Sequence, residues 1–208
     1  MALSDLQANI ANDLTRADLT SQIASAVNDA IKFYEPSRFW FNVTRSLTFP
    51  TVVNQQPYTG SDLAQIPNII RIDKLWLNSP GSIYALDWYE PDEFEWLIPL
   101  QGGGKPTVYT YIDQQILLWP TPNSTAFTLR PHMHYRLAAL VQPTDTNAWC
   151  TNAEQLIRAH AKLLLYTNVL EDTDGAARMQ GEIQAFKDKL DYETSARMAT
   201  GRIRGTEF

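Results

Sequence analysis

Apolar residues recur with helical spacing at both ends of the chain, whereas the middle third alternates apolar and polar positions. Leucine and isoleucine side chains four residues apart predict a short helix over residues 4–14. A longer apolar stripe predicts a second helix over residues 20–34. Near the other end, wide apolar faces predict helices over residues 154–170 and 176–199. Both ends of the chain are therefore expected to be helical.

Local signals mark where these helices begin and end. Ser4 is the expected N-cap of the first helix, because its hydroxyl can accept a hydrogen bond from a free backbone N–H group. Pro36 ends the second helix, since the residue before a proline avoids the helical region. Thr151 and Glu154 have the spacing of a capping box in front of the third long helix.

The middle of the chain is rich in tryptophan, tyrosine and proline, and its alternation predicts β-structure. A change of phase in one expected strand predicts a bulge near Asp73 and Lys74. Pro131 indicates that the last strand lies at an edge or a bulge. A short helix is expected from Pro91 through Trp96. The predicted strands cover residues 45–51, 69–77, 82–87, 107–113, 115–119 and 125–136.

This order of elements predicts an α+β protein. We expect a discontinuous helical bundle built from both termini, with an inserted antiparallel β-sandwich or open barrel. The bundle would comprise residues 1–40 and 150–199, and the β-rich domain residues 41–149. Residues 200–208 would form an extended C-terminal arm, because they follow the last helix and contain two arginines and two glycines.

Composition and charge narrow the function. The 208 residues carry a formal net charge of −6, which argues against a general nucleic-acid clamp. Cys150 is the single cysteine, so no internal disulfide is expected, and we expect it to be a small buried residue. No apolar run approaches the roughly 20 residues that a membrane span needs, and no signal peptide is recognisable. We therefore expect no membrane partner.

Histidines give a weak indication of a metal site. His132 and His134 alternate on one strand and could bind a metal ion together. Arg130 and Arg136 share their face and oppose a divalent cation, so surface polar residues are the favoured interpretation. His160 lies within an apolar helix without a nearby nucleophile motif and is expected to be a core or interface histidine. No cofactor is predicted.

Carboxylates gather beside tryptophans around the short predicted helix. Such a patch could bind or cleave a glycan with paired carboxylates. Acidic residues in a first helical turn also serve as ordinary partners of the helix dipole, which is the favoured interpretation. The residues concerned are Trp88, Glu90, Asp92, Glu93, Glu95 and Trp96. Because no complete nucleophile, metalloprotease or dinucleotide motif is present, the chain is predicted not to be an enzyme.

The tail allows two interpretations. It could be a frayed terminus, which is the default at chain ends. It could also be an arm that orders on a partner, with Ile203 and Phe208 as apolar anchors and Arg202 and Arg204 pairing with acidic groups. Composition leaves both open.

Several segments resemble head-to-tail adaptor proteins of tailed bacteriophages. The opening helix, the R-x-D-L turn and the start of the second helix resemble that family at residues 3–6 (LSDL) and 14–23 (LTRADLTSQI). The strand and proline turn at residues 116–122 (ILLWPTP) are similar as well. The resemblance resumes at residues 152–157 (NAEQLI) and continues through the last two helices. The order of elements is more specific than any single segment.

The resemblance implies a structural virion protein at the head–tail junction, assembled in the host cytoplasm. It implies a homo-oligomeric ring, typically a dodecamer, that docks on the portal protein and extends the DNA channel. Genomic DNA would pass through without sequence-specific binding, and the ring would provide a docking surface for a tail nozzle, fibre or other tail component. Residues 196–208 would be the portal-binding arm, with the interface residues Arg197, Arg202, Ile203, Arg204 and Phe208.

Two alternatives stay open from the sequence. One is another virion connector, such as a tail terminator or nozzle. The other, from a different class, is a carbohydrate-binding or glycan-cleaving module that uses the tryptophan and carboxylate patch.

Overall fold

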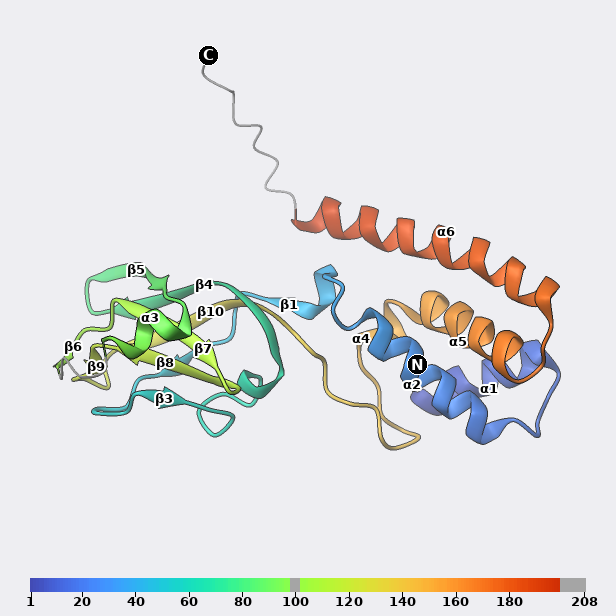
Figure 1. Ribbon diagram of the computed structural model, residues 1–208, viewed down its shortest axis with the longest axis horizontal. Helices are drawn as coiled ribbons and strands as arrows, with labels where there is room; N and C mark the ends of the chain where they lie inside the picture. Colours follow the sequence, from blue (N-terminus) through green and yellow to red (C-terminus); the bar gives the residue numbers. More distant parts are fainter. Residues whose placement is uncertain (98–101, 199–208) are drawn as a thin grey trace, which may run out of the picture. The chain divides into compact units, whose positions relative to one another are not determined.

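The computed structural model describes residues 1–97 and 102–198. The chain divides into two compact units, and each is described by itself. The first joins Met1–Phe41 to the chain from Leu137 onward, and the second is Asn42–Arg136. The described residues contain six α-helices and one large curled sheet (Figure 1), so the mixed α and β class is confirmed.

The first unit contains five helices, four of which the hydrophobic pattern predicts to within a few residues. The fifth, α4, is a single turn that the pattern did not indicate. It forms because Trp149 and Cys150 are drawn into the core. The helices are α1 (Leu3–Leu14), α2 (Thr20–Tyr34), α4 (Ala148–Thr151), α5 (Glu154–Asn168) and α6 (Thr173–Met198).

One hydrophobic core joins the two ends of the chain. The apolar faces of α1 and α2 pack with α5, and α6 runs back along α5 (Figure 1). Leu156, Ile157 and Leu165 of α5 are almost fully buried in this core. Leu137 and Leu140 also pack against it, although residues 41–149 were expected to belong to the inserted domain. The chain therefore returns to the helical unit earlier than the sequence predicts.

The helix caps differ from those expected. Helix α1 begins at Leu3, so Ser4 is not its N-cap, and the Asp5 carboxylate instead accepts a hydrogen bond from the Ala2 N–H group at 2.9 Å. Thr151 ends α4 and does not cap α5, whose N-terminus has no side-chain cap. Helix α5 nevertheless begins at Glu154 as predicted, and α1 begins one residue before its predicted start.

Ion pairs connect α1 to α5. Arg158 pairs with Asp13 and, at 3.4 Å, with Glu154, while the Lys162 ammonium lies 3.0 Å from Asp13. The hydrogen bond from Arg158 lowers the pKa of the Asp13 carboxyl group. Because these side chains are partly exposed, solvent screening limits each pair to about 1 kcal/mol or less. The pairs fix the approach of α1 more than they stabilise the core.

The second unit contains the curled sheet, with the strand order β1-β10-β4-β5-β7-β8-β3 and β2 also paired with β10. The strands are β1 (Val43–Thr44), β2 (Phe49–Pro50), β3 (Pro57–Tyr58), β4 (Ile69–Ser79), β5 (Ser82–Trp88), β7 (Val108–Ile112), β8 (Gln115–Trp119) and β10 (Thr128–Tyr135). Helix α3 (Pro91–Glu95) connects β5 to β7, and β6 (Gly103–Gly104) pairs with β9 (Thr121–Pro122) in a separate ladder.

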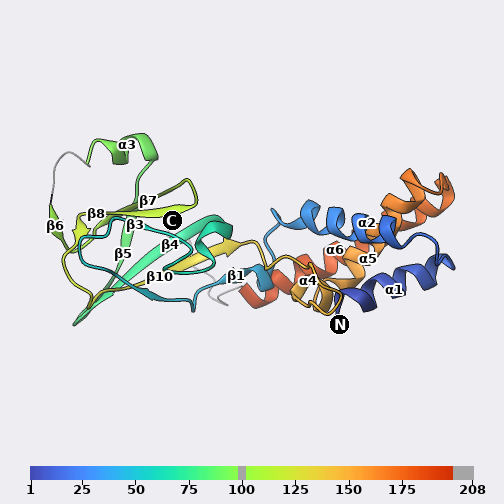
Figure 2. The ribbon, with the colours of Figure 1, turned by 90° about the horizontal axis from the view of Figure 1, so that it is seen from below.

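The open-barrel alternative is confirmed by a curled sheet, whereas the sandwich alternative and the purely antiparallel pairing are corrected. Strands β5 and β7 pair in parallel, and so do β6 and β9. The long connection through α3 allows β5 and β7 to pair in parallel, because a parallel pair needs a crossover rather than a hairpin. In addition, the large sheet curls into a half-barrel around its own core instead of forming two stacked sheets (Figure 2).

Strand β10 shows where the sequence pattern holds and where it fails. Its pairing with β4 skips Asp73, which confirms the predicted bulge. Pro131 does not lie on an edge strand, since it pairs with Leu75 in the middle of the sheet. On the other side of β10, β2 pairs with Thr128 and Leu129, and β1 pairs with Met133 and His134. Pro131 lies in the gap between these two short strands, where its missing N–H group leaves no pairing bond unmade.

Two glycines of α6 provide a matched test of close packing. A Cβ atom on Gly175 would lie 2.6 Å from Asp172 Oδ2 and 2.7 Å from Tyr166 Cδ1, whereas one on Gly181 would meet nothing within 4 Å. We expect Gly175→Ala to lower the free energy of unfolding by about 1–3 kcal/mol through overpacking. Gly181→Ala should raise it by up to about 1 kcal/mol, because alanine favours helix. Urea denaturation of both variants measures this, and equal effects would contradict the close contact.

His160 should make the helical unit sensitive to acid. Its Nδ1 atom lies 3.0 Å from the Tyr34 hydroxyl oxygen within the core, and burial lowers the pKa of its imidazole. The unfolded chain therefore binds a proton more readily than the folded chain, so stability is complete above about pH 6.5 and declines below it.

We expect wild-type protein to lose more stability than His160→Gln between about pH 7.5 and pH 5.5, by at most about 1.4 kcal/mol, the limit set by an unfolded imidazole pKa near 6.5. Urea titrations at both pH values measure the difference. Asp13 does not interfere, because its lowered carboxyl pKa places its titration at more acidic pH. Parallel pH dependence in the two proteins would contradict this prediction.

Candidate functional site

The last described turn of α6 packs on a single tryptophan. The guanidinium carbon of Arg197 lies 3.8 Å from the centre of the Trp40 ring. The backbone N–H group of Trp40 donates a hydrogen bond to Thr194 Oγ1 at 3.3 Å. Arg197 also pairs with Glu193 one turn earlier, at 3.8 Å. These contacts hold the end of α6 at the point where residues 199–208 begin.

The local sequence explains why Trp40 is available for this contact. Its neighbours Phe39 and Phe41 both pack on Trp149, with ring centres 5.9 and 5.1 Å away. Trp40 lies between them in a single 3-10 turn (Trp40–Asn42), and its ring lies against Arg197. Of these three consecutive aromatic residues, Phe39 and Phe41 pack on the core, and Trp40 packs on the end of α6.

The five predicted interface residues are only partly within the described structure. Arg197 is described, and its side chain is about half exposed while it lies over Trp40. The other four, Arg202, Ile203, Arg204 and Phe208, lie outside the described residues. Sequence reasoning missed Trp40 and Thr194. The aromatic run at residues 39–41 was the available signal, because three adjacent aromatic side chains cannot all enter one core.

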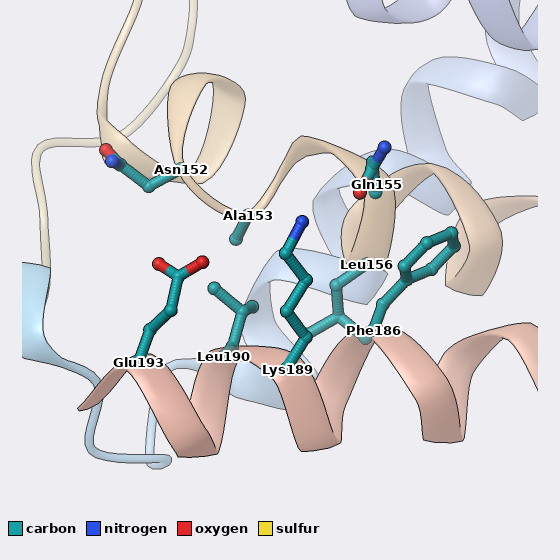
Figure 3. Close-up of a pocket in the computed structure, with 8 residues that line it drawn as sticks. All are labelled: Asn152, Ala153, Gln155, Leu156, Phe186, Lys189, Leu190 and Glu193. Carbon is teal, nitrogen blue, oxygen red and sulfur yellow. The ribbon is translucent and has the colours of Figure 1, made fainter. Parts of the chain in front are cut away.

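A small polar cavity adjoins this site along α5 and α6. Its volume is about 50 Å³, which suits a few water molecules rather than an organic ligand. Figure 3 shows Glu193 and Lys189 of α6 on the same side as Asn152 and Ala153, just before α5. Glu193 therefore lines this cavity and also pairs with Arg197, so the cavity adjoins the contact between Arg197 and Trp40.

The structure does not support the histidine pair as a metal site. Among the described residues, no group of three His, Cys, Asp or Glu side chains could hold a metal ion. His134 is buried rather than on the surface, on a strand position that pairs with Val43 of β1. Burial lowers the pKa of His132, and Arg45 and Arg130 lower it further. His160 is a core residue, as predicted.

The tryptophan and carboxylate patch is exposed. Trp88 and Trp96 are 56% and 81% accessible, and the carboxylates of α3 face solvent. Trp88 also lines a groove of about 440 Å³ with Tyr109 and Tyr111, between β4 and β7. Burial, together with the smaller effect of the Asp73 charge, raises the pKa of the Tyr109 phenol to about 12, so this phenol stays protonated.

The family follows from a comparison with known proteins. A family model described as SU10 adaptor protein matches residues 1–206. The chain belongs to the SU10 adaptor protein family. A search of curated proteins found no match.

Membership confirms the resemblance to head-to-tail adaptors of tailed bacteriophages. The chain is a phage adaptor protein, and its family is structural and not known for catalysis. Within residues 1–97 and 102–198, no helix is both long and apolar enough to cross a bilayer.

Removing the Trp40 ring should loosen the end of α6. Trp40→Ala removes the cation–π contact, which is worth about 0.5–1 kcal/mol at a partly exposed site. We therefore expect amide hydrogen exchange at residues 194–198 to become about two- to fivefold faster. Arg197→Ala should have the same effect, whereas Arg178→Ala, an exposed arginine earlier in α6, should not. Unchanged exchange in both site variants would show that the contact does not hold this turn.

Proposed function

We propose that the protein forms a ring beneath the portal, extends the DNA channel and provides the docking surface for tail components. The observation that carries this proposal is the adaptor family match over residues 1–206. In this proposal the protein lies at the head–tail junction of the virion, as a structural component and not as an enzyme. A dodecameric ring, a tail nozzle or fibre as the tail partner, and assembly in the host cytoplasm are further parts of the proposal.

In this proposal the two compact units act as separate domains. The helices from both chain ends form one bundle that docks on the portal, and residues 42–136 form the domain that faces tail components. Shared burial supports the bundle, since α1, α2, α5 and α6 contribute to one hydrophobic core. The bundle then presents a rigid surface, which lowers the entropy lost on docking.

The C-terminal segment acts as the portal-binding arm. Arg202 and Arg204 pair with acidic groups of the portal, and Ile203 and Phe208 fill apolar pockets. The anchoring of Arg197 and Thr194 at Trp40 supports this role, because a fixed root limits the space that the arm explores. Arg197 would then have two roles. Its contact with Trp40 would position the arm, and its exposed side would contact the portal.

The charge of the chain suits a passage for DNA. A net charge of −6 gives the ring little attraction for phosphates, so DNA slides through without stable binding. Compared with this function, the glycan alternative has only the exposure of Trp88 and Trp96 in its favour. No observation favours a tail terminator or nozzle over an adaptor.

Deletion of residues 199–208 tests the arm. We expect loss of binding to the cognate portal by about a hundredfold or more, because both the arginines and the apolar anchors are removed. The free energy of unfolding should change by less than about 0.5 kcal/mol, since every described residue of the helical core is retained. Surface-immobilised portal and urea denaturation give the two measurements.

Point variants refine the test. Arg202→Gln with Arg204→Gln should weaken binding and reduce its salt dependence, whereas Ile203→Ala should weaken it without changing that dependence. Gln142→Ala, in a loop of the helical unit, serves as a surface control. A truncated protein that binds the portal as tightly as the full chain would refute the arm.

A further inference from the structure

A cluster of cations lies on the outer face of strands β4 and β10. Arg130 pairs across the strands with Trp76, and His132 pairs with Lys74. Arg45 lies close enough to lower the pKa of the His132 imidazole. The neighbouring inward residues Leu75, Leu77 and Leu129 belong to the core, so alternation along the strands places the cluster on the other face. We call Arg45, Lys74, Arg130 and His132 the cationic patch.

The cationic patch is only partly offset within the described chain, because Asp73 is the one described carboxylate that counteracts the lowering of the His132 imidazole pKa. None of its four residues forms an ion pair with a described carboxylate. The Arg130 Nε–H group is buried and has no acceptor among the described residues, although buried polar groups are usually satisfied. A local excess of positive charge in a chain of net charge −6 therefore needs an explanation.

An acidic strip lies elsewhere on the same unit. Its carboxylates come from the end of β5, the following link and α3, and all are exposed: Asp87, Glu90, Asp92, Glu93 and Glu95. Phe94 is buried and fixes α3 against β7, and Trp96 at its end is 81% exposed. No carboxylate of the strip forms an ion pair with a described residue. Phe94 therefore holds α3 against the sheet, and the negative charges of the strip have no ion-pair partner among the described residues.

The curl of the sheet separates the two charged surfaces. Strand β5 lies between β4 and β7 in the strand order, so the patch and the strip belong to different parts of the sheet. Figure 2 shows α3 on one side of the curled sheet and β10 on the other. One unit thus carries complementary charges on two separate surfaces, and no residue of the helical unit is needed to form either.

We propose that the acidic strip of one copy docks on the cationic patch of the next, which makes this contact the head-to-tail interface of the ring. The inference rests on the ring proposed above. Cyclic symmetry requires two different, mutually complementary surfaces on each subunit, and the patch and strip meet that requirement. Trp96 supplies an aromatic anchor whose face can lie over an arginine of the patch.

Charge reversal tests the interface. In one variant Glu90, Asp92 and Glu93 become lysine, and in the other Arg45, Lys74 and Arg130 become glutamate. Each alone places like charges across the contact and should reduce the number of copies bound per portal by about tenfold at a fixed concentration. A chain with all six changes is complementary again and should recover assembly, as should an equimolar mixture of the two single-surface variants.

Controls separate this inference from the proposed function. Arg71→Glu reverses an exposed cation of the same unit outside the patch and should assemble normally. Native mass spectrometry with the cognate portal counts the copies, and binding of a single copy reports the arm independently. Thermal unfolding shows that each variant is folded.

Two results would overturn the interface. One is normal assembly of both reversed variants. The other is failure of the six-change chain, although folded, to recover. Absence of any ring from wild-type protein on its portal would instead refute the proposed function.

Discussion

Burial of α5 against helices from the opposite end of the chain is the contact on which the helical unit depends. Leu156, Ile157 and Leu165 are sealed by α2 from one side, and α6 packs along α5 from another. A fully buried leucine typically contributes about 2–5 kcal/mol, so a few such residues exceed the net stability of many domains. Residues before 42 and after 136 must therefore meet before either can form a stable structure.

Helix α6 depends on this core in a different way. It is 26 residues long but buries only Gly175, Met179 and Leu190. Its position is fixed near its ends, by the close approach of Gly175 to Tyr166 and by the contact of Arg197 with Trp40. Between its ends α6 packs on the core through Leu190, Ile183 and Phe186, while its other side faces solvent.

The β-rich unit separates its tasks by face. Its inner face contains the core around Leu75, Leu77 and Ile116, while the outer face carries segregated charges. Because side chains alternate across a strand, the same strands can build a core and a charged surface without conflict. Changes on the outer face should therefore have little effect on folding.

The sequence by itself determined every described helix except α4, most strands, the bulge at Asp73 and the family, because periodicity and segment order are local or linear properties. Only the tertiary structure decided the parallel β5–β7 pair, the burial of His134 and the stacking of Arg197 on Trp40. Each of these joins residues that are distant in the chain. No hydrophobic period records such long-range choices, since they are settled by which surfaces pack best once the elements exist.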